Sequence, residues 1–261
     1  MKPHRINGLL LKYYYITINR VDRLFDIIYW PILDLFIWGF TAIFIQKISE
    51  VNVLSMLLGG VILWVFVWRA SQDIAVFILE DFWSRNLYHL FSSPVKLSEH
   101  LVSIIIMGFL RAMATFILMW IVGMMFYSFN ILAISPLLIA FSVMLLTIFG
   151  WAVGLFVAAF IFRFGQRIQV MAWSVTFLLS PFACVFYPLS ALPGWAAKIA
   201  SVVPVTYVFE AWRAMIGGTP LNIAGLMYSL ISSVILFVAM AFFLQQSFRK
   251  SRKTGLLAKG D

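Results

Sequence analysis

The stretch SPLLIAFSVMLLTIFGWAVGLFVAAFIF, from Ser135 to Phe162, contains no charged residue. A helix that crosses the hydrocarbon core of a membrane needs about 20 mostly apolar residues, so this stretch is long enough to span it. Gly150, Gly154 and Ala158 form a row of small residues that is typical of close helix packing, with cavity lining as the alternative. Comparable apolar stretches lie on both sides, at Ile27–Ile45, Leu54–Leu79, Leu101–Phe126, Gln169–Pro188 and Ile223–Leu244. The sequence therefore predicts an all-α, polytopic membrane protein with six transmembrane helices.

The composition of the whole chain supports this class. Of its 261 residues, 63% are hydrophobic and 11% are charged, whereas soluble domains have about 45–50% apolar and about 25% charged residues. A soluble core of this size cannot bury so much apolar surface, which excludes an ordinary cytosolic enzyme, a disordered chain and a secreted disulfide scaffold. Because no stretch is polar enough to fold separately in water, we expect one transmembrane domain over residues 1–261.

The basic residues indicate which loops face the cytoplasm. When the loops are numbered alternately from the N-terminal tail, one set carries fourteen Lys and Arg residues and the other only Lys47, Lys198 and Arg213. Basic residues concentrate in cytoplasmic loops. Both termini are therefore predicted to be cytoplasmic, as an even number of spans requires. The net charge of +9 is explained by these loops, so we expect no nucleic-acid partner.

Residues 1–26 predict an amphipathic helix that does not cross the membrane. Apolar positions such as Leu9 and Tyr13 recur at helical spacing, while Lys12 and Arg20 lie off that stripe. A helix of this kind lies in the membrane interface with its apolar face toward the acyl chains. Three consecutive tyrosines, from Tyr13, favour the same zone, and a solvated basic tail is the alternative.

A second amphipathic segment occupies residues 80–95, between the second and third predicted spans. Two acidic residues begin it, where the helix dipole is positive, and a proline ends it. Its apolar side chains follow helical spacing, so the helix either presses them into a groove on another protein or rests on the bilayer surface. The residues assigned to this segment are Glu80, Asp81, Trp83, Leu87, Leu90, Phe91, Ser93 and Pro94.

Residues 189–222, between the fifth and sixth predicted spans, are rich in Pro and Gly. Two apolar stretches flank Pro204 and are each too short to span, which predicts a re-entrant helical hairpin entering from the outer face. Irregular backbone at that depth must be buried in protein or line a cavity, so the hairpin is a candidate lid over a pathway. An ordinary outer loop is the alternative, and the prolines leave the span count open around residues 169–222. The candidate residues are Tyr187, Pro188, Pro193, Gly194, Trp195, Pro204, Glu210 and Arg213.

Four charged residues lie inside predicted spans, where each costs about 2.5–3.5 kcal/mol on insertion scales. Arg69 and Asp73 are one helical turn apart and are expected to neutralise each other. Asp34 and Arg111 lie on different spans and are candidates for an interhelical pair. Contact with a transported molecule is the functional alternative for all four.

Two of these segments resemble the ABC type-2 (export-type) transporter permease family. The loop that closes on Ser93-Pro94 is similar to the coupling helix of that family, and the run from Phe186 to Trp195 with the following Pro204 is similar to its outer hairpin. The resemblance covers essentially the whole chain. Arg85-Asn86 departs from the Gly or Thr that members often have there, which bears on the choice of ATPase partner.

This resemblance implies a homodimer, or a dimer with a similar permease, bound to two copies of a separate ABC ATPase subunit. It implies a multi-pass protein of a bacterial or archaeal cytoplasmic membrane. The activity implied is export of a hydrophobic or amphipathic cargo, such as a drug, a lipid or a lipid-linked glycan, by alternating access. The residue 80–95 segment would then couple the spans to the ATPase.

Chemical motifs are scarce. No G-x-x-x-x-G-K-[ST] sequence occurs, so ATP and Mg²⁺ are expected on the partner subunit and no cofactor in this chain. The histidines, His4, His89 and His100, lack metal-ligand spacing to Cys or Glu, and neither H-E-x-x-H nor G-x-S-x-G is present. We therefore expect no metal, no catalytic residue and no enzymatic activity of this chain alone. A lipid-modifying membrane enzyme and a passive channel are the alternatives, although a channel would show polar rings along a span.

Overall fold

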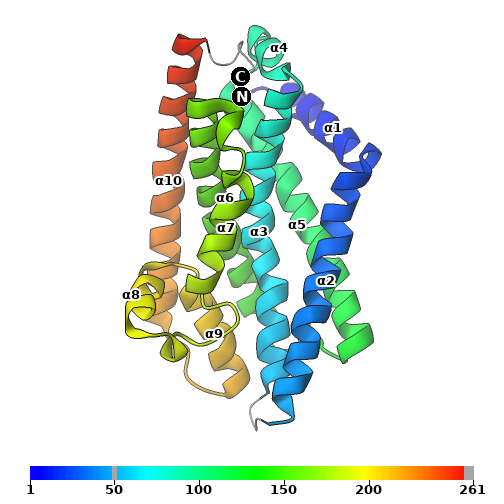
Figure 1. Cartoon of the computed structure of the whole chain (residues 1–261), viewed down its shortest axis with the longest axis vertical. Coiled ribbons are helices and arrows are strands. Elements are labelled where there is room, and N and C mark those ends of the chain that lie inside the picture. The colour runs from blue at the N-terminus through cyan, green and yellow to red at the C-terminus, as the bar shows by residue number, and fades with distance from the viewer. Residues whose placement is uncertain (49–51, 256–261) are drawn as a thin grey trace.

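The computed structural model describes residues 1–48 and 52–255, and in this part of the chain every regular element is a helix. Together they form an elongated bundle (Figure 1). One end of the bundle holds α4, the start of α1 and the end of α10, and we call it the α4 end. The opposite end holds α8 and α9, and we call it the hairpin end. The helices are α1 (Pro3–Asn19), α2 (Val21–Gln46), α3 (Val53–Trp83), α4 (Asn86–Ser92), α5 (Leu97–Tyr127), α6 (Pro136–Phe164), α7 (Met171–Leu179), α8 (Gly194–Val202), α9 (Thr206–Gly217) and α10 (Ile223–Thr254).

Among the described residues, five helices, α2, α3, α5, α6 and α10, are long and apolar enough to cross a membrane, and the count is six if the bent pair α8–α9 is one span. The expected all-α, multi-span architecture is confirmed. The predicted fifth span differs, because apolar helix covers only Met171–Phe182. The backbone of Cys184 has a left-handed φ of 54°, which no helix accommodates, so the chain to Pro188 is irregular.

The central helix of the bundle is α3, against which α2, α5, α6 and α7 all pack. Glycines let α6 approach it closely. A Cβ atom on Gly150 would lie 2.7 Å from the Cβ of Ala70, and one on Gly154 would lie 2.8 Å from the carbonyl oxygen of Ser71. The row of small residues therefore serves helix packing, as the first of its two interpretations predicts.

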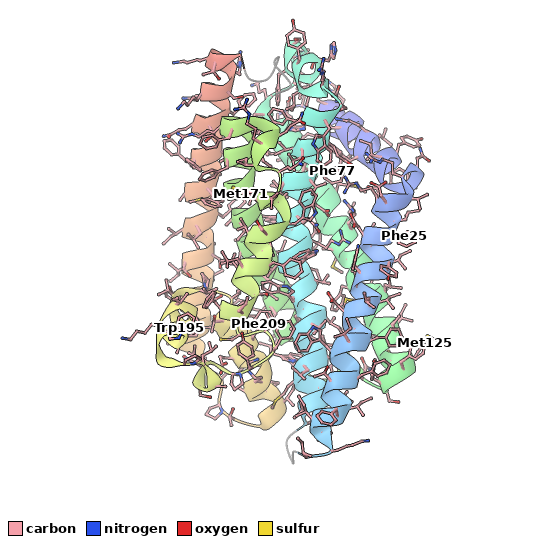
Figure 2. The ribbon with its side chains drawn as sticks, viewed as in Figure 1. Phe25, Phe77, Met125, Met171, Trp195 and Phe209 are labelled. Carbon is pink, nitrogen blue, oxygen red and sulfur yellow. The ribbon has the colours of Figure 1, made fainter. Side chains whose placement is uncertain are left out.

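The buried apolar side chains form two clusters, one in each half of the bundle. The hairpin-end cluster includes Phe66, Phe149 and Phe209, and the α4-end cluster includes Phe77 and Phe162. Figure 2 shows Phe77 and Phe209 in the two halves, whereas Trp195 and Met125 project from the bundle.

A buried charged group separates the two clusters along α3. Asp73 lies 2.8 Å from Nη1 of Arg111 and 3.8 Å from Nη1 of Arg69, and all three side chains are nearly inaccessible. The expected Arg69–Asp73 pair is present. The candidate pair of Asp34 with Arg111 is wrong, because Arg111 binds Asp73 instead. Asp34 lies on the exposed side of α2 and has no hydrogen-bond or ion-pair partner among the residues described.

Candidate functional site

The chain turns sharply at the α4 end, between α3 and α4. Helix α3 continues through Glu80 and Asp81 to Trp83, and Arg85 then adopts a left-handed φ of 55°. A new helix, α4, starts at Asn86. The two acidic residues therefore end the long helix, and the expectation that they begin the short one is wrong.

Asp81 is the centre of a buried polar network that joins α1, α3 and α5. Its Oδ2 accepts a hydrogen bond from the hydroxyl of Tyr13 at 3.0 Å and lies 3.0 Å from Nε2 of His100. Its Oδ1 pairs with Lys12 and accepts a 3.1 Å bond from the side chain of Asn86, the first residue of α4. Burial and the adjacent carboxylate hold the pKa of Tyr13 well above its usual value, so its hydroxyl stays a donor.

Two further carboxylates attach the N-terminal region to the bundle. Glu80 accepts hydrogen bonds from Nε of Arg23 at 2.8 Å and Nη1 of Arg20 at 3.1 Å. Glu99, at the start of α5, accepts a 2.8 Å bond from the backbone N–H of Lys2. These contacts place the N-terminus against the same end of the bundle as α4.

The amphipathic helix α1 has the apolar stripe that its sequence predicts. Leu9, Tyr13 and Thr17 are buried, mainly where α1 packs on α5. The stripe is thus covered by the chain itself. The helix ends at Asn19, and an extended residue, Arg20, separates it from α2, so α1 is shorter than the 1–26 that the sequence predicts for an interfacial helix.

The apolar face of α4, which the sequence predicts to dock on another protein, is buried against the chain itself. Leu87 is only 1% exposed, and Phe91 packs on the rings of His100 and Phe248. Because these side chains contact their own chain, they are not available to a partner. The side chains that α4 and the preceding turn expose are Ser84, Arg85, Tyr88, His89 and Ser92, followed by Ser93 and Pro94.

The other two apolar residues predicted for docking are only partly buried. Trp83 is 41% exposed and donates its indole N–H to Oε1 of Gln169 at 3.3 Å. Leu90 is half-buried against the α4-end cluster. Neither the hydrophobic spacing nor the acidic start reveals that α10 and α5 cover the apolar face, since that depends on helices far away in the sequence.

The opposite end carries the expected helical hairpin, with α8 and α9 bent by 102°. Buried Pro204 lies in the bend, where the hydroxyl of Thr206 donates to the carbonyl of Ala200 at 2.8 Å. The fully buried Trp212 seats α9 on α3, because a Cβ atom on Gly59 would lie 2.1 Å from its ring. The hairpin therefore rests on a notch in the central helix.

Glu210 and Arg213 bind the hairpin to the irregular segment that precedes it. Oε1 of Glu210 accepts hydrogen bonds from Nη2 of Arg213 at 2.7 Å and from the backbone N–H of Leu189 at 2.8 Å. Nη2 of Arg213 also donates to the carbonyl of Cys184 at 2.8 Å. The hydroxyl of Tyr187 donates to the carbonyl of Pro181 at 2.7 Å. The other predicted residues, Pro188, Pro193, Gly194 and Trp195, are exposed.

No group of three or more His, Cys, Asp or Glu side chains that could hold a metal ion occurs in the described parts of the chain. The structure is distinguished by its arrangement of helices: a multi-span bundle with the short helix α4 at one end and the bent hairpin of α8 and α9 at the other. This is the architecture of a polytopic membrane protein.

A family model for the ABC-2 family transporter protein matches residues 40–243, a region that begins within α2, ends within α10 and includes both α4 and the hairpin. The chain belongs to this family, and is the membrane component of an ABC transporter. A search of curated protein sequences finds no significant match.

Proposed function

We propose that the protein is the permease subunit of an ATP-driven exporter, which moves a hydrophobic or amphipathic cargo outward across a bacterial or archaeal cytoplasmic membrane. ATP and Mg²⁺ bind to two copies of a separate ATPase subunit. The α4 end faces the cytoplasm and the hairpin end faces outward. Family membership supports the ATPase as the kind of partner, and the basic loops at the α4 end support this orientation.

The observation that carries the proposal is the position of α4. It is held between two long helices, α3 and α5, and presents Tyr88, His89 and Arg85 away from the bundle. A partner that pushes on this exposed face moves both helices, because Leu87 and the Asp81 network fix α4 to them. ATP-driven closure of the ATPase dimer is in this way converted into a rearrangement of the spans.

The outer hairpin is the proposed exit gate. The hairpin can open by a change of the bend at Pro204 and by loss of the ion pair between Glu210 and Arg213, and neither change unfolds α3. For net export, the inward-open and outward-open states must bind the cargo with different affinities.

A second permease copy completes the pathway in this proposal. A carboxylate exposed to lipid is costly, yet Asp34 lies among the exposed apolar residues of α2, near Trp30 and Ile37. We place this side of α2 against the second copy or the water-filled pathway between copies. A disulfide formed between copies of an Asp34→Cys variant in membranes supports this arrangement, and its absence beside efficient cross-linking elsewhere on the surface contradicts it.

The coupling role is tested with the Tyr88→Ala variant. The side chain of Tyr88 is 56% exposed, so its removal leaves the fold intact. A tyrosine at the centre of an interface commonly contributes about 2 kcal/mol, and its loss weakens ATPase association by roughly thirtyfold. The measurement is co-purification with the ATPase subunit and ATP-dependent cargo movement in vesicles.

Tyr14→Ala is the matched control, because Tyr14 is 49% exposed and belongs to α1, not to α4. It should leave association and transport unchanged. If Tyr88→Ala behaves like Tyr14→Ala, α4 does not dock the ATPase through this face.

A further inference from the structure

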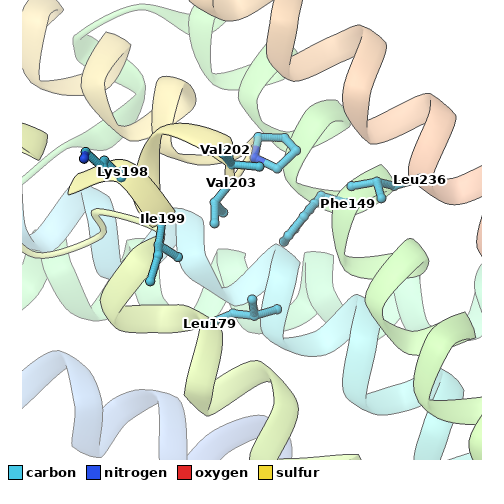
Figure 3. Close-up of a pocket in the computed structure, with 8 residues that line it drawn as sticks. Phe149, Leu179, Lys198, Ile199, Val202, Val203 and Leu236 are labelled. Carbon is cyan, nitrogen blue, oxygen red and sulfur yellow. The ribbon is translucent and has the colours of Figure 1, made fainter. Parts of the chain in front are cut away.

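An open apolar cavity of about 520 Å³ lies under the hairpin (Figure 3). Its walls come from four helices: Phe149 of α6, Leu179 of α7, Val202 of α8 and Leu236 of α10. The volume is within the range of about 300–1,000 Å³ that is usual for small-ligand sites. Seven of the eight lining residues are apolar, and the eighth is Lys198.

Two residues of the cavity wall lie far from the hairpin-end starts of their helices. Phe149 and Leu236 each lie thirteen residues from the hairpin-end starts of their helices, Pro136 and Ile223. At 1.5 Å per residue this is about 20 Å along the helix axis. Half of a bilayer hydrocarbon core is about 15 Å thick, so Phe149 and Leu236 lie where the ends of acyl chains are expected.

The mouth of the cavity has the opposite character. Lys198 is exposed on α8, and its ammonium group has no hydrogen-bond or ion-pair partner among the residues described. Figure 3 shows Lys198 on the far side of the cavity from Leu236. The hairpin acid Glu210 does not neutralise this lysine, because it binds Arg213 and the backbone of Leu189.

The helices around the cavity are suited to lipid contact. Helix α10 exposes Ile231, Ile235 and Val238 along its length, and α8 exposes Ile199 and Val202. The carbonyl of Val202 accepts a hydrogen bond from the hydroxyl of Tyr228 at 2.9 Å, which fixes α8 to α10 beside the cavity. Exposed apolar side chains thus lie on two of the helices that line the cavity, and a hydrogen bond joins these two helices.

We propose that this cavity binds one hydrocarbon chain of an anionic membrane lipid, whose phosphate pairs with Lys198. Apolar walls recognise the chain, and the unpaired ammonium group recognises the charge of the headgroup. A lipid held there bridges α8 of the hairpin to α6, α7 and α10. The proposal does not depend on transport, because it concerns the membrane that surrounds the protein.

The test uses the full chain, purified and reconstituted without an ATPase in bilayers that contain a photoactivatable lipid. The reactive group is in the acyl chain, and the headgroup is phosphatidylglycerol or phosphatidylcholine. Mass spectrometry locates the cross-links. We expect labelling of the peptides that carry Phe149, Val202 and Leu236, about fivefold stronger with phosphatidylglycerol, as expected for one basic side chain near a membrane surface.

Two matched pairs of variants make the result specific. Val202→Trp should block labelling by filling the cavity, whereas Val238→Trp, at a residue that is 60% exposed but does not line it, should not. Lys198→Gln should reduce phosphatidylglycerol labelling to the phosphatidylcholine level, Lys198→Arg should preserve it, and Lys47→Gln should have no effect. Equal labelling by both lipids, or labelling spread evenly over α10, would each overturn the proposal.

Discussion

The two ends of the bundle are held together by different forces. At the α4 end, three buried carboxylates, Glu80, Asp81 and Glu99, each bind at least one group that is 57 to 97 residues away in the sequence. At the hairpin end, the main ion pair joins Glu210 to Arg213, three residues apart, and apolar side chains make most other contacts. Long-range polar bonds hold the α4 end together, whereas the hairpin is held to the bundle mainly by apolar packing, such as that of Trp212 against α3.

The largest effect is expected from breaking the network at the α4 end. Asp81→Ala removes the carboxylate that binds the buried Tyr13 and His100 side chains, and it leaves Lys12 and the side chain of Asn86 without this acceptor. Removal of one partner from a buried charged network commonly costs about 3 kcal/mol or more. The purified variant should unfold at a clearly lower temperature, and protease should cleave α1 from the bundle more readily.

Asp22→Ala is the control for this change. Asp22 also pairs with an arginine, at 3.1 Å from Arg20, but its side chain is 55% exposed. Exposed ion pairs contribute about 1 kcal/mol or less. Equal destabilisation by both variants would show that the buried network does not hold α1.

The sequence predicts the spans better than it predicts this network. Long apolar stretches identify α2, α3, α5, α6 and α10, because charges inside a membrane are costly. The partners of Asp81 are not visible in the sequence, since Lys12 and His100 approach it only after α1 and α5 have packed on α3. For the same reason the spacing of Leu87 identifies an amphipathic helix but not the surface that covers it.

A medium effect is expected where the hairpin rests on α3. Gly59→Ala places a methyl group within 2.1 Å of the ring of Trp212, so the ring and α9 must move. Overpacking of this kind costs about 1–3 kcal/mol. Thermal unfolding measures the loss, and weaker protection of α9 in hydrogen exchange places it at the hairpin.

Gly8→Ala is the matched control, because Gly8 is also in a helix but has open space around its Cβ position. Alanine should stabilise that helix by up to about 1 kcal/mol. Opposite signs for the two substitutions are the expected result, and a stabilised Gly59→Ala variant would contradict the close seat of Trp212.

The sequence predicts the hairpin better than it predicts the network around Asp81. Pro204 and the short apolar stretches around it predict the bend, and Glu210 and Arg213 lie three residues apart on one helix, where they can meet. The sequence does not predict the short fifth helix, because hydropathy does not reveal the left-handed backbone of Cys184.

The smallest effect on stability is expected from Glu210→Gln. The side chain of Glu210 is 33% exposed, so loss of its charge should cost only about 1 kcal/mol. If the hairpin is the exit gate, transport should nevertheless fall strongly while assembly with the ATPase is unchanged. Arg213→Gln should do the same, and normal transport by both variants would exclude a gating role for this ion pair.

A comparison of the two ends also provides the most direct test of coupling through α4. A photo-cross-linking amino acid is placed at Tyr88 of α4 or at Trp195 of the hairpin, which are 56% and 66% exposed. The variants are irradiated in membranes that contain the ATPase, which is identified by labelling with a reactive ATP analogue. Coupling through α4 predicts a product between the permease and the ATPase from Tyr88 and none from Trp195. A product from Trp195 alone, or from neither site while the complex is intact, would contradict coupling through α4.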